Sequence, residues 1–187
     1  MQPIPELIEV LAKCRALEPE IAATGDHLVA CLRAGGKILS CGNGGSAADA
    51  LHLAEELVGR YRRPRKALAG VCLSADGTAL TCIGNDFGFD QVFARQVEAL
   101  GKPGDVLVGF TTSGNSPNLL AAFAAAKAAG VKTILLAGKD GGRARGQCDR
   151  ELIVPSDNGA RVQEVHTLII HSWLEVVDRE FAGSQAS

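Results

Sequence analysis

The chain has 187 residues and a formal net charge of −2. This charge leaves no basic surplus for nonspecific binding to nucleic acid, and an aromatic content of 4% argues against the stacking platforms of single-strand binders. No stretch of about 18 apolar residues occurs, and the cysteines form no CxxC pair, so we expect a cytoplasmic protein with neither a nucleic-acid nor a membrane partner.

Helical periodicity opens the chain, from Ile4 to Leu32, and ends at Gly35 and Gly36. Short apolar runs then alternate with helical stretches. Such alternation predicts an α/β fold, with a five-stranded parallel sheet covered by helices on both faces. We expect a single domain over 1–187, with an N-terminal helical segment at 1–35 and an α/β core at 36–187. Strands are expected at 37–41, 68–74, 105–111, 132–138 and 151–155, and helices at 46–60, 77–84, 88–100, 116–129 and 160–181.

The loop after the first expected strand reads CGNGGSAADALH and is rich in glycine. It places Asn43, Gly44, Gly45 and Ser46 at a strand-to-helix turn, where free backbone N–H groups can approach an anion. Asp49 follows Ser46 by three residues, which is typical of a capping box. A glycine-rich turn of this kind is often only a helix cap, so this loop alone does not establish a phosphate site.

A second loop, TTSGNSPNLL, follows the third expected strand. Pro117 directly after Ser116 is typical of a helix that begins with an N-cap serine and a proline at its first position. The hydroxyls of Thr111, Thr112, Ser113 and Ser116 could reach a phosphate that the helix dipole also attracts. Two such loops at one sheet edge indicate a small phosphomonoester. Neither loop matches GxxxxGK[ST] or fits GxGxxG, which disfavours a nucleotide triphosphate or NAD.

Two residues on the helix after the first loop could carry chemistry. His52 and Glu56 are four residues apart, so both side chains project from one face, while Glu55 points about 100° away and is expected to be solvated. A lone histidine at helical spacing is more often structural. The neighbouring carboxylate at the mouth of a phosphate site favours a functional pair. The basic stretch RYRRPRK at 60–66 is expected to form a solvated loop after this helix.

Several segments together resemble the sugar isomerase (SIS) domain family and, within it, the phosphoheptose isomerases. The most specific are the HLAEE and QEVHTLIIH helices. The resemblance implies a flavodoxin-like five-stranded sheet, and a homotetramer with active sites between subunits. It also implies interconversion of the sugar phosphate sedoheptulose 7-phosphate with D-glycero-D-manno-heptose 7-phosphate. The remaining segments that carry it are CGNGGSAADALHLAEELVGRY, IGNDFGFDQVFARQVEALG, TTSGNSPN and LAGKDGG.

The resemblance also implies roles for individual residues. Glu56 and His171 match the catalytic positions, and Ala47, Ala48 and Ala160 depart from residues found in some relatives, which leaves the exact substrate preference open. One Zn²⁺ per subunit is implied, with His52, Glu56, Gln163 and His171 as ligands. The matched substrate-binding positions are Asn43, Gly44, Gly45, Ser46, Glu56, Asn85, Asp86, Thr111, Thr112, Ser113, Ser116 and Gln163.

The last helix sets a geometric condition on this metal site. Gln163, Thr167 and His171 are spaced four apart and share a face, whereas His166 points elsewhere and is expected to pack or cap. Gln163 and His171 are therefore separated by about 12 Å of helix rise, too far for both to reach one ion directly. We hypothesise that one of the two comes from a neighbouring chain.

Aldose–ketose isomerisation needs a base beside the carbonyl carbon and a second group that moves a proton. Glu56 is the expected base, and His171 can exchange the second proton near neutral pH. Two alternatives remain: a noncatalytic SIS protein that binds the DnaA replication initiator, and a sugar-phosphate sensor. The adaptor relative lacks an acid and a histidine matching Glu56 and His171, and no helix-turn-helix precedes the sheet, so both alternatives are disfavoured.

Overall fold

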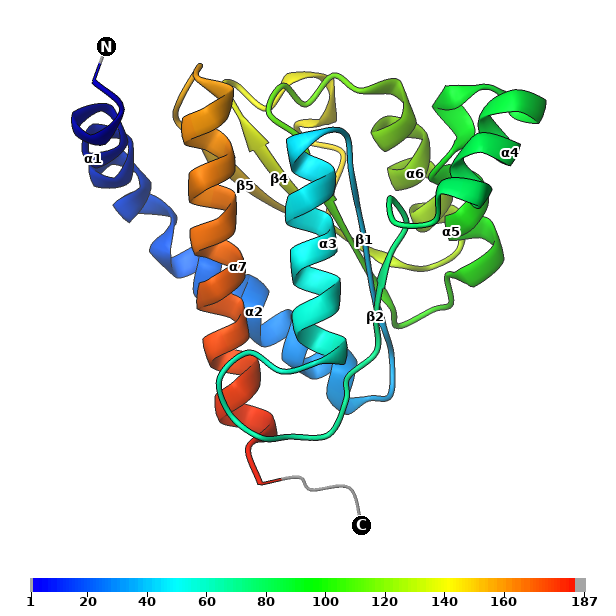
Figure 1. The fold of residues 1–187 in the computed structure, drawn as a ribbon, viewed down its shortest axis with the longest axis horizontal. Helices are drawn as coiled ribbons and strands as arrows, with labels where there is room; N and C mark the ends of the chain where they lie inside the picture. Colours follow the sequence, from blue (N-terminus) through cyan, green and yellow to red (C-terminus); the bar gives the residue numbers. More distant parts are fainter. Residues whose placement is uncertain (1, 184–187) are drawn as a thin grey trace.

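A five-stranded parallel sheet forms the centre of the computed structural model, which describes residues 2–183 (Figure 1). The strand order is β2-β1-β3-β4-β5, and every neighbouring pair is parallel. The five strands expected from the sequence are confirmed, each within two residues at either end. Their bounds are β1 Ile38–Gly42, β2 Gly70–Cys72, β3 Val106–Phe110, β4 Lys132–Gly138 and β5 Arg150–Val154.

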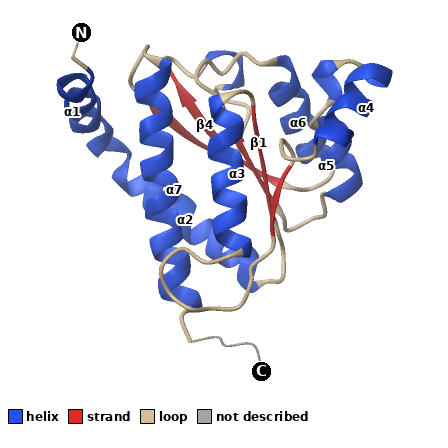
Figure 2. Ribbon diagram, in the orientation of Figure 1, coloured by secondary structure: helices blue, strands red, loops and turns tan. Residues whose placement is uncertain are grey.

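Helices cover both faces of the sheet (Figure 2). The segment expected to be helical over 88–100 forms a helix only from Ala94, because Gly88 at φ +87° takes the chain out of helical conformation. A 3₁₀ turn, Phe89–Gln91, fills most of the gap. The helices are α1 Pro3–Cys14, α2 Glu18–Arg33, α3 Gly45–Val58, α4 Gly77–Phe87, α5 Ala94–Leu100, α6 Pro117–Ala128 and α7 Gly159–Phe181.

Alternate strand residues build two separate cores, one on each face of the sheet. On the first face, Ile38, Val106 and Ile134 pack under α1, α2, α3 and α7. On the second face, Leu39 and Leu107 pack under α5 and α6. Because both faces are covered, the central strand β3 is apolar throughout, as a buried parallel sheet requires. In Figure 1, α3 and α7 lie side by side on the first face, and this pairing positions the site.

The loop at 59–69 is anchored to α7, although the sequence suggested that its basic stretch would be solvated. That expectation is wrong for Arg65, whose side chain is fully buried and pairs with Asp178 at 3.1 Å. Asp178 also accepts hydrogen bonds from the backbone N–H groups of Arg62 and Arg63. A buried guanidinium needs such a partner, because an unpaired charge in the interior is costly.

No helix within residues 2–183 is both long enough and apolar enough to cross a membrane.

Candidate active site

The first glycine-rich loop leaves β1 and opens α3. Helix α3 begins at Gly45 with Gly44 as its N-cap, so the hydroxyl of Ser46 is not used as a cap. The side chain of Asn43 pairs with that of Asn118 on α6 through two reciprocal amide hydrogen bonds, each 2.9 Å long. These bonds tie the first loop to the start of α6. The loop therefore presents the buried Ser46 and the first N–H groups of α3 to one side.

The capping box expected between Ser46 and Asp49 is not present. The Asp49 carboxylate instead accepts a hydrogen bond from Thr167 on α7, at 3.2 Å. The N-terminus of α3 has no side-chain cap within the described residues. The backbone N–H groups of Ser46 and Ala47 donate to the carbonyls of Asn43 and Gly44, so among the first N–H groups of α3 that of Gly45 remains available to an anion.

The second loop leaves β3 and opens α6. The buried hydroxyl oxygen of Thr111 accepts hydrogen bonds from the backbone N–H groups of Ser113 and Gly114, which fixes the turn. Gly114 has φ +67°, and a Cβ there would lie 1.8 Å from the carbonyl oxygen of Gly141, so this turn needs glycine. Ser116 is the N-cap residue ahead of Pro117, as expected, and its side chain makes no capping hydrogen bond.

The two loops enclose a small cavity of about 110 Å³ at the carboxyl ends of the strands. Its lining is neutral and rich in hydroxyl and amide groups. The helices α3 and α6 both begin at its edge, so their N-terminal partial charges favour an anion there. We name it the phosphate pocket, and define it by Asn43, Ser46, Phe110, Thr111, Thr112, Ser113, Ser116 and Gln163.

Gln163 reaches this pocket from α7. Its side chain packs against Gly45, where a Cβ would lie 2.4 Å from the Gln163 amide nitrogen. Gln163 therefore lines the phosphate pocket, and the family resemblance implied a substrate contact at this position.

Five of the expected substrate contacts are not among the residues that line the pocket: Gly44, Gly45, Glu56, Asn85 and Asp86. Asn85 and Asp86 are exposed on α4, where the Asn85 amide donates a 2.7 Å hydrogen bond to the Asp86 carboxylate. Neither lines the phosphate pocket within residues 2–183.

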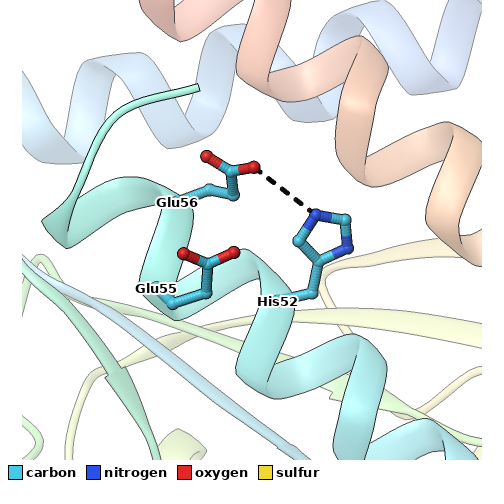
Figure 3. A group of neighbouring side chains, drawn as sticks. All are labelled: His52, Glu55 and Glu56. Carbon is cyan, nitrogen blue, oxygen red and sulfur yellow. Dashed lines mark ion pairs between the residues drawn. The ribbon is translucent and has the colours of Figure 1, made fainter. Parts of the chain in front are cut away.

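A second group of polar side chains lies further along α3. The Nε2 of His52 is 3.6 Å from a carboxylate oxygen of Glu56, and Figure 3 shows the two side chains turned toward each other. Glu55 stands beside them, and one ligand atom from each of the three lies within 4.8 Å of the others. His52 and Glu56 are half-buried, whereas Glu55 is exposed, as expected from its direction.

His171 joins this group from α7. Its ring lies edge-on to His52, with ring centroids 5.1 Å apart, and its other neighbour is Tyr61, whose ring stacks on it at 5.4 Å. Glu56 on α3 and His171 on α7, the acid and the imidazole expected for catalysis, thus both adjoin His52 within one chain. We call His52, Glu56 and His171 the acid–imidazole cluster. Such a pair can act as general base and general acid on a bound molecule.

A buried pair links the two helices between the pocket and the cluster. The His166 ring nitrogen Nδ1 is 3.9 Å from the Asp49 carboxylate, and neither that nitrogen nor the facing oxygen has a hydrogen-bond partner within the described residues. Burial raises the pKa of Asp49 to about 6 and lowers the pKa of His166 to about 4. His166 also packs edge-on to Phe110, which confirms the packing role expected from the sequence.

Sequence reasoning missed three contributors to this site: Tyr61, Asn118 and the Asp49 and His166 pair. Tyr61 lies in an irregular loop, where no periodic pattern indicates the direction of a side chain. Asn118 occupies the first turn of α6 after the Ser-Pro start, a position that could have been searched for a partner to Asn43.

Comparison with known proteins identifies the family and the fold. The SIS domain family model matches residues 4–138. The chain is 53% identical to the phosphoheptose isomerase of Campylobacter jejuni subsp. jejuni serotype O:6 (strain 81116 / NCTC 11828), covering 92% of this chain and 93% of that protein. It is 55% identical to that of Helicobacter pylori (strain P12), covering 93% and 91%. The structure of the Neisseria gonorrhoeae phosphoheptose isomerase superposes with a TM-score of 0.88 at 44% identity, covering 94% and 95% of the two chains.

Proposed function

Since this chain belongs to the SIS domain family and, within it, to the phosphoheptose isomerases, we propose that it interconverts sedoheptulose 7-phosphate and D-glycero-D-manno-heptose 7-phosphate. One observation carries the proposal furthest. Glu56 and His171, which come from different helices, both adjoin His52, and the same chain carries a neutral phosphate pocket at the start of α3. An isomerase needs both parts, because one anchors the substrate and the other moves its protons.

In the proposed reaction the phosphate pocket holds the phosphate at the helix N-termini. Glu56 removes the proton from C1 of the ketose, next to the C2 carbonyl, and returns a proton to C2. His171 gives a proton to the C2 oxygen and takes one from the C1 oxygen, so the proton count of the sugar is unchanged. The carboxylate of Glu56 suits the first step because its partner His52 leaves one carboxylate oxygen free of ion pairs.

We extend the proposal to a bound Zn²⁺ ion, because the acid–imidazole cluster offers the nitrogen and oxygen ligands that zinc prefers. His52 and Glu56 already lie within 3.6 Å of each other, and the His171 ring adjoins His52. When bound, zinc would polarise the carbonyl and stabilise negative charge on the enediolate.

The proposal includes a cytoplasmic homotetramer whose sites draw on more than one chain. Gln163 lies at the phosphate pocket, whereas His171 lies in the acid–imidazole cluster, and the two are about 12 Å apart along α7. If Gln163 is a ligand as well, it serves the cluster of another chain. Exposed Leu51 and Val58 on α3 and Leu168 on α7 supply an apolar surface for that contact.

A direct assay tests the proposal. Purified protein is incubated with sedoheptulose 7-phosphate, and formation of the aldose is followed with and without a chelator. We expect aldose to form, chelation to abolish turnover, and added Zn²⁺ to restore it. Binding of the sugar phosphate without any turnover, in protein supplied with Zn²⁺, would contradict the proposal and favour a sensor.

A further inference from the structure

The ring of His171 is held in place by two other rings. Tyr61 lies against its face, with an interplanar angle of 24°, and His52 meets it edge-on, with an interplanar angle of 82°. Within residues 2–183 we find no hydrogen bond to either ring nitrogen of His171. A histidine that exchanges protons usually has its ring direction set by a hydrogen bond at one nitrogen. Here the stacked ring of Tyr61 is the contact that sets the plane of the His171 imidazole.

Tyr61 itself is held by a buried anchor. Its loop crosses the C-terminal half of α7 (Figure 1), where the Asp178 carboxylate accepts hydrogen bonds from the backbone N–H groups of the next two residues. Asp178 is only 3% exposed, and Arg65 binds its second oxygen. Asp178 follows His171 by seven residues, so the anchor lies two helical turns along the same face of α7.

The same anchor reaches back to α3. The Arg65 guanidinium donates hydrogen bonds to the backbone carbonyls of Glu56 and Leu57, at 2.6 and 2.9 Å. These carbonyls belong to the last turn of α3, and that of Leu57 also accepts a hydrogen bond from the backbone N–H of Leu68. One buried side chain therefore fixes the backbone at Glu56, the loop that carries Tyr61, and the helix that carries His171.

We propose that Tyr61 is a positioning residue for His171, held in register by the Arg65–Asp178 ion pair. Its ring fixes the imidazole plane so that a ring nitrogen faces the substrate, and it does not touch the reacting atoms. This inference rests on the proposed function, since it assigns a task to a contact of His171. The hydroxyl of Tyr61 makes no hydrogen bond within the described residues, so the ring alone should suffice.

The test compares Tyr61→Leu with Tyr61→Phe, using kcat and KM for sedoheptulose 7-phosphate. A misplaced catalytic group costs about tenfold to a hundredfold in rate, so we expect kcat of Tyr61→Leu to fall by that factor with KM within about twofold. Tyr61→Phe keeps the stacked ring and should match the parent. Arg63→Ala is the matched control, because Arg63 is exposed in the same loop and supplies only its backbone N–H to the anchor.

A spectroscopic readout separates positioning from general loosening. The ring protons of His171 should shift in the NMR spectrum of Tyr61→Leu, where the ring current of Tyr61 is lost, and should stay in place in Tyr61→Phe. Thermal unfolding confirms that each variant is folded. If Tyr61→Leu does not fold, Tyr61→Met replaces it in the comparison, because the longer and more flexible methionine can fill the space without a ring.

The outcomes distinguish this inference from the proposed function. If the parent protein does not convert sedoheptulose 7-phosphate, the proposed function fails, and the inference fails with it. If the parent is active and folded Tyr61→Leu keeps its kcat, only the inference fails. It also fails if Tyr61→Phe loses as much kcat as Tyr61→Leu, because the hydroxyl would then be the working group.

Discussion

The phosphate pocket and the acid–imidazole cluster lie on the same two helices but are built in different ways. The pocket is neutral and uses strand-end loops, backbone N–H groups and hydroxyls, with Ser46 and Thr111 buried. The cluster is titratable, half-buried, and formed by side chains that project from the C-terminal half of α3 and the middle of α7. The pocket thus follows from the parallel sheet, whereas the cluster depends on how two helices are placed against each other.

The helix dipole explains why the two regions occupy opposite ends of α3. The N-terminus of α3 carries partial positive charge and suits a phosphate, so the pocket needs no lysine or arginine. Glu56 lies in the last turn, where the partial charge is negative and a carboxylate is disfavoured. Arg65 offsets this, because it binds the carbonyl oxygens of Glu56 and Leu57. A catalytic acid at this position therefore needs the anchored loop, and the pocket does not.

The largest effect is expected from a substitution that removes the proposed base and leaves substrate binding unchanged. Glu56→Gln keeps the shape of the side chain and removes the base, so kcat should fall by about three powers of ten or more while KM changes little. Steady-state kinetics with sedoheptulose 7-phosphate, and binding of the substrate by calorimetry, measure the two parts.

Glu55→Gln is the matched control for this prediction. Glu55 is the adjacent carboxylate on α3, is exposed, and also stands within ligand distance of His52. It should keep nearly full activity. Equal losses in both variants would show that the carboxylates act together, and an active Glu56→Gln variant would remove Glu56 from the mechanism.

The sequence predicted the pocket more completely than the cluster, for physical reasons. The strands are short apolar runs, and Ser116 followed by Pro117 marks a helix start, so both strand-end loops could be placed by local rules. The meeting of His52 with His171 depends on tertiary packing of α3 against α7. Helical spacing gave the face of each residue, and the resemblance to a family, rather than spacing, paired the two.

Two buried polar contacts could not be predicted from the residues near them in the sequence. The stretch at 60–66 has the composition of a solvated loop, and burial of Arg65 follows only from Asp178, which lies 113 residues later. Asp49 fits the spacing of a capping box, yet its carboxylate accepts a hydrogen bond from Thr167 on α7, which lies 118 residues later. In both cases a partner distant in sequence decided the outcome.

A smaller effect is expected from a substitution in the phosphate pocket, and it tests whether the pocket binds the phosphate. Ser116→Ala removes a hydroxyl that makes no cap bond and faces the cavity, so one hydrogen bond to the phosphate should be lost. A hydrogen bond to a charged group contributes about 1.5 kcal/mol, which corresponds to about a tenfold rise in KM with kcat changed far less. Ser156→Ala is the control, since Ser156 also precedes a helix but lies outside the pocket. A fall in kcat with unchanged KM would mean that the pocket takes part in the chemistry.

The smallest expected effect concerns stability and the link between the two regions. Burial raises the pKa of Asp49 to about 6, whereas an unfolded aspartate titrates near 3.9. The folded state therefore binds the Asp49 proton more tightly than the unfolded state does. The stability that this proton contributes is fully present below about pH 4 and is lost as the pH rises through about 6. Asp49→Asn mimics the protonated form at every pH. Its free energy of unfolding relative to the parent should therefore rise between pH 4 and pH 7, by on the order of 1 kcal/mol after allowance for partial solvent screening.

Urea unfolding at several pH values measures this difference. Burial lowers the pKa of His166 to about 4, so this histidine, which faces Asp49, is mainly neutral above about pH 5, where most of the difference should develop. Asp26→Asn is the control, because Asp26 is exposed on α2, and it should show no such trend. A stability difference between Asp49→Asn and the parent that stays constant from pH 4 to pH 7 would mean that Asp49 is not a buried acid. The contact between α3 and α7 would then rest on apolar packing alone, and only the loop anchor at Arg65 would hold the acid–imidazole cluster in register with the pocket.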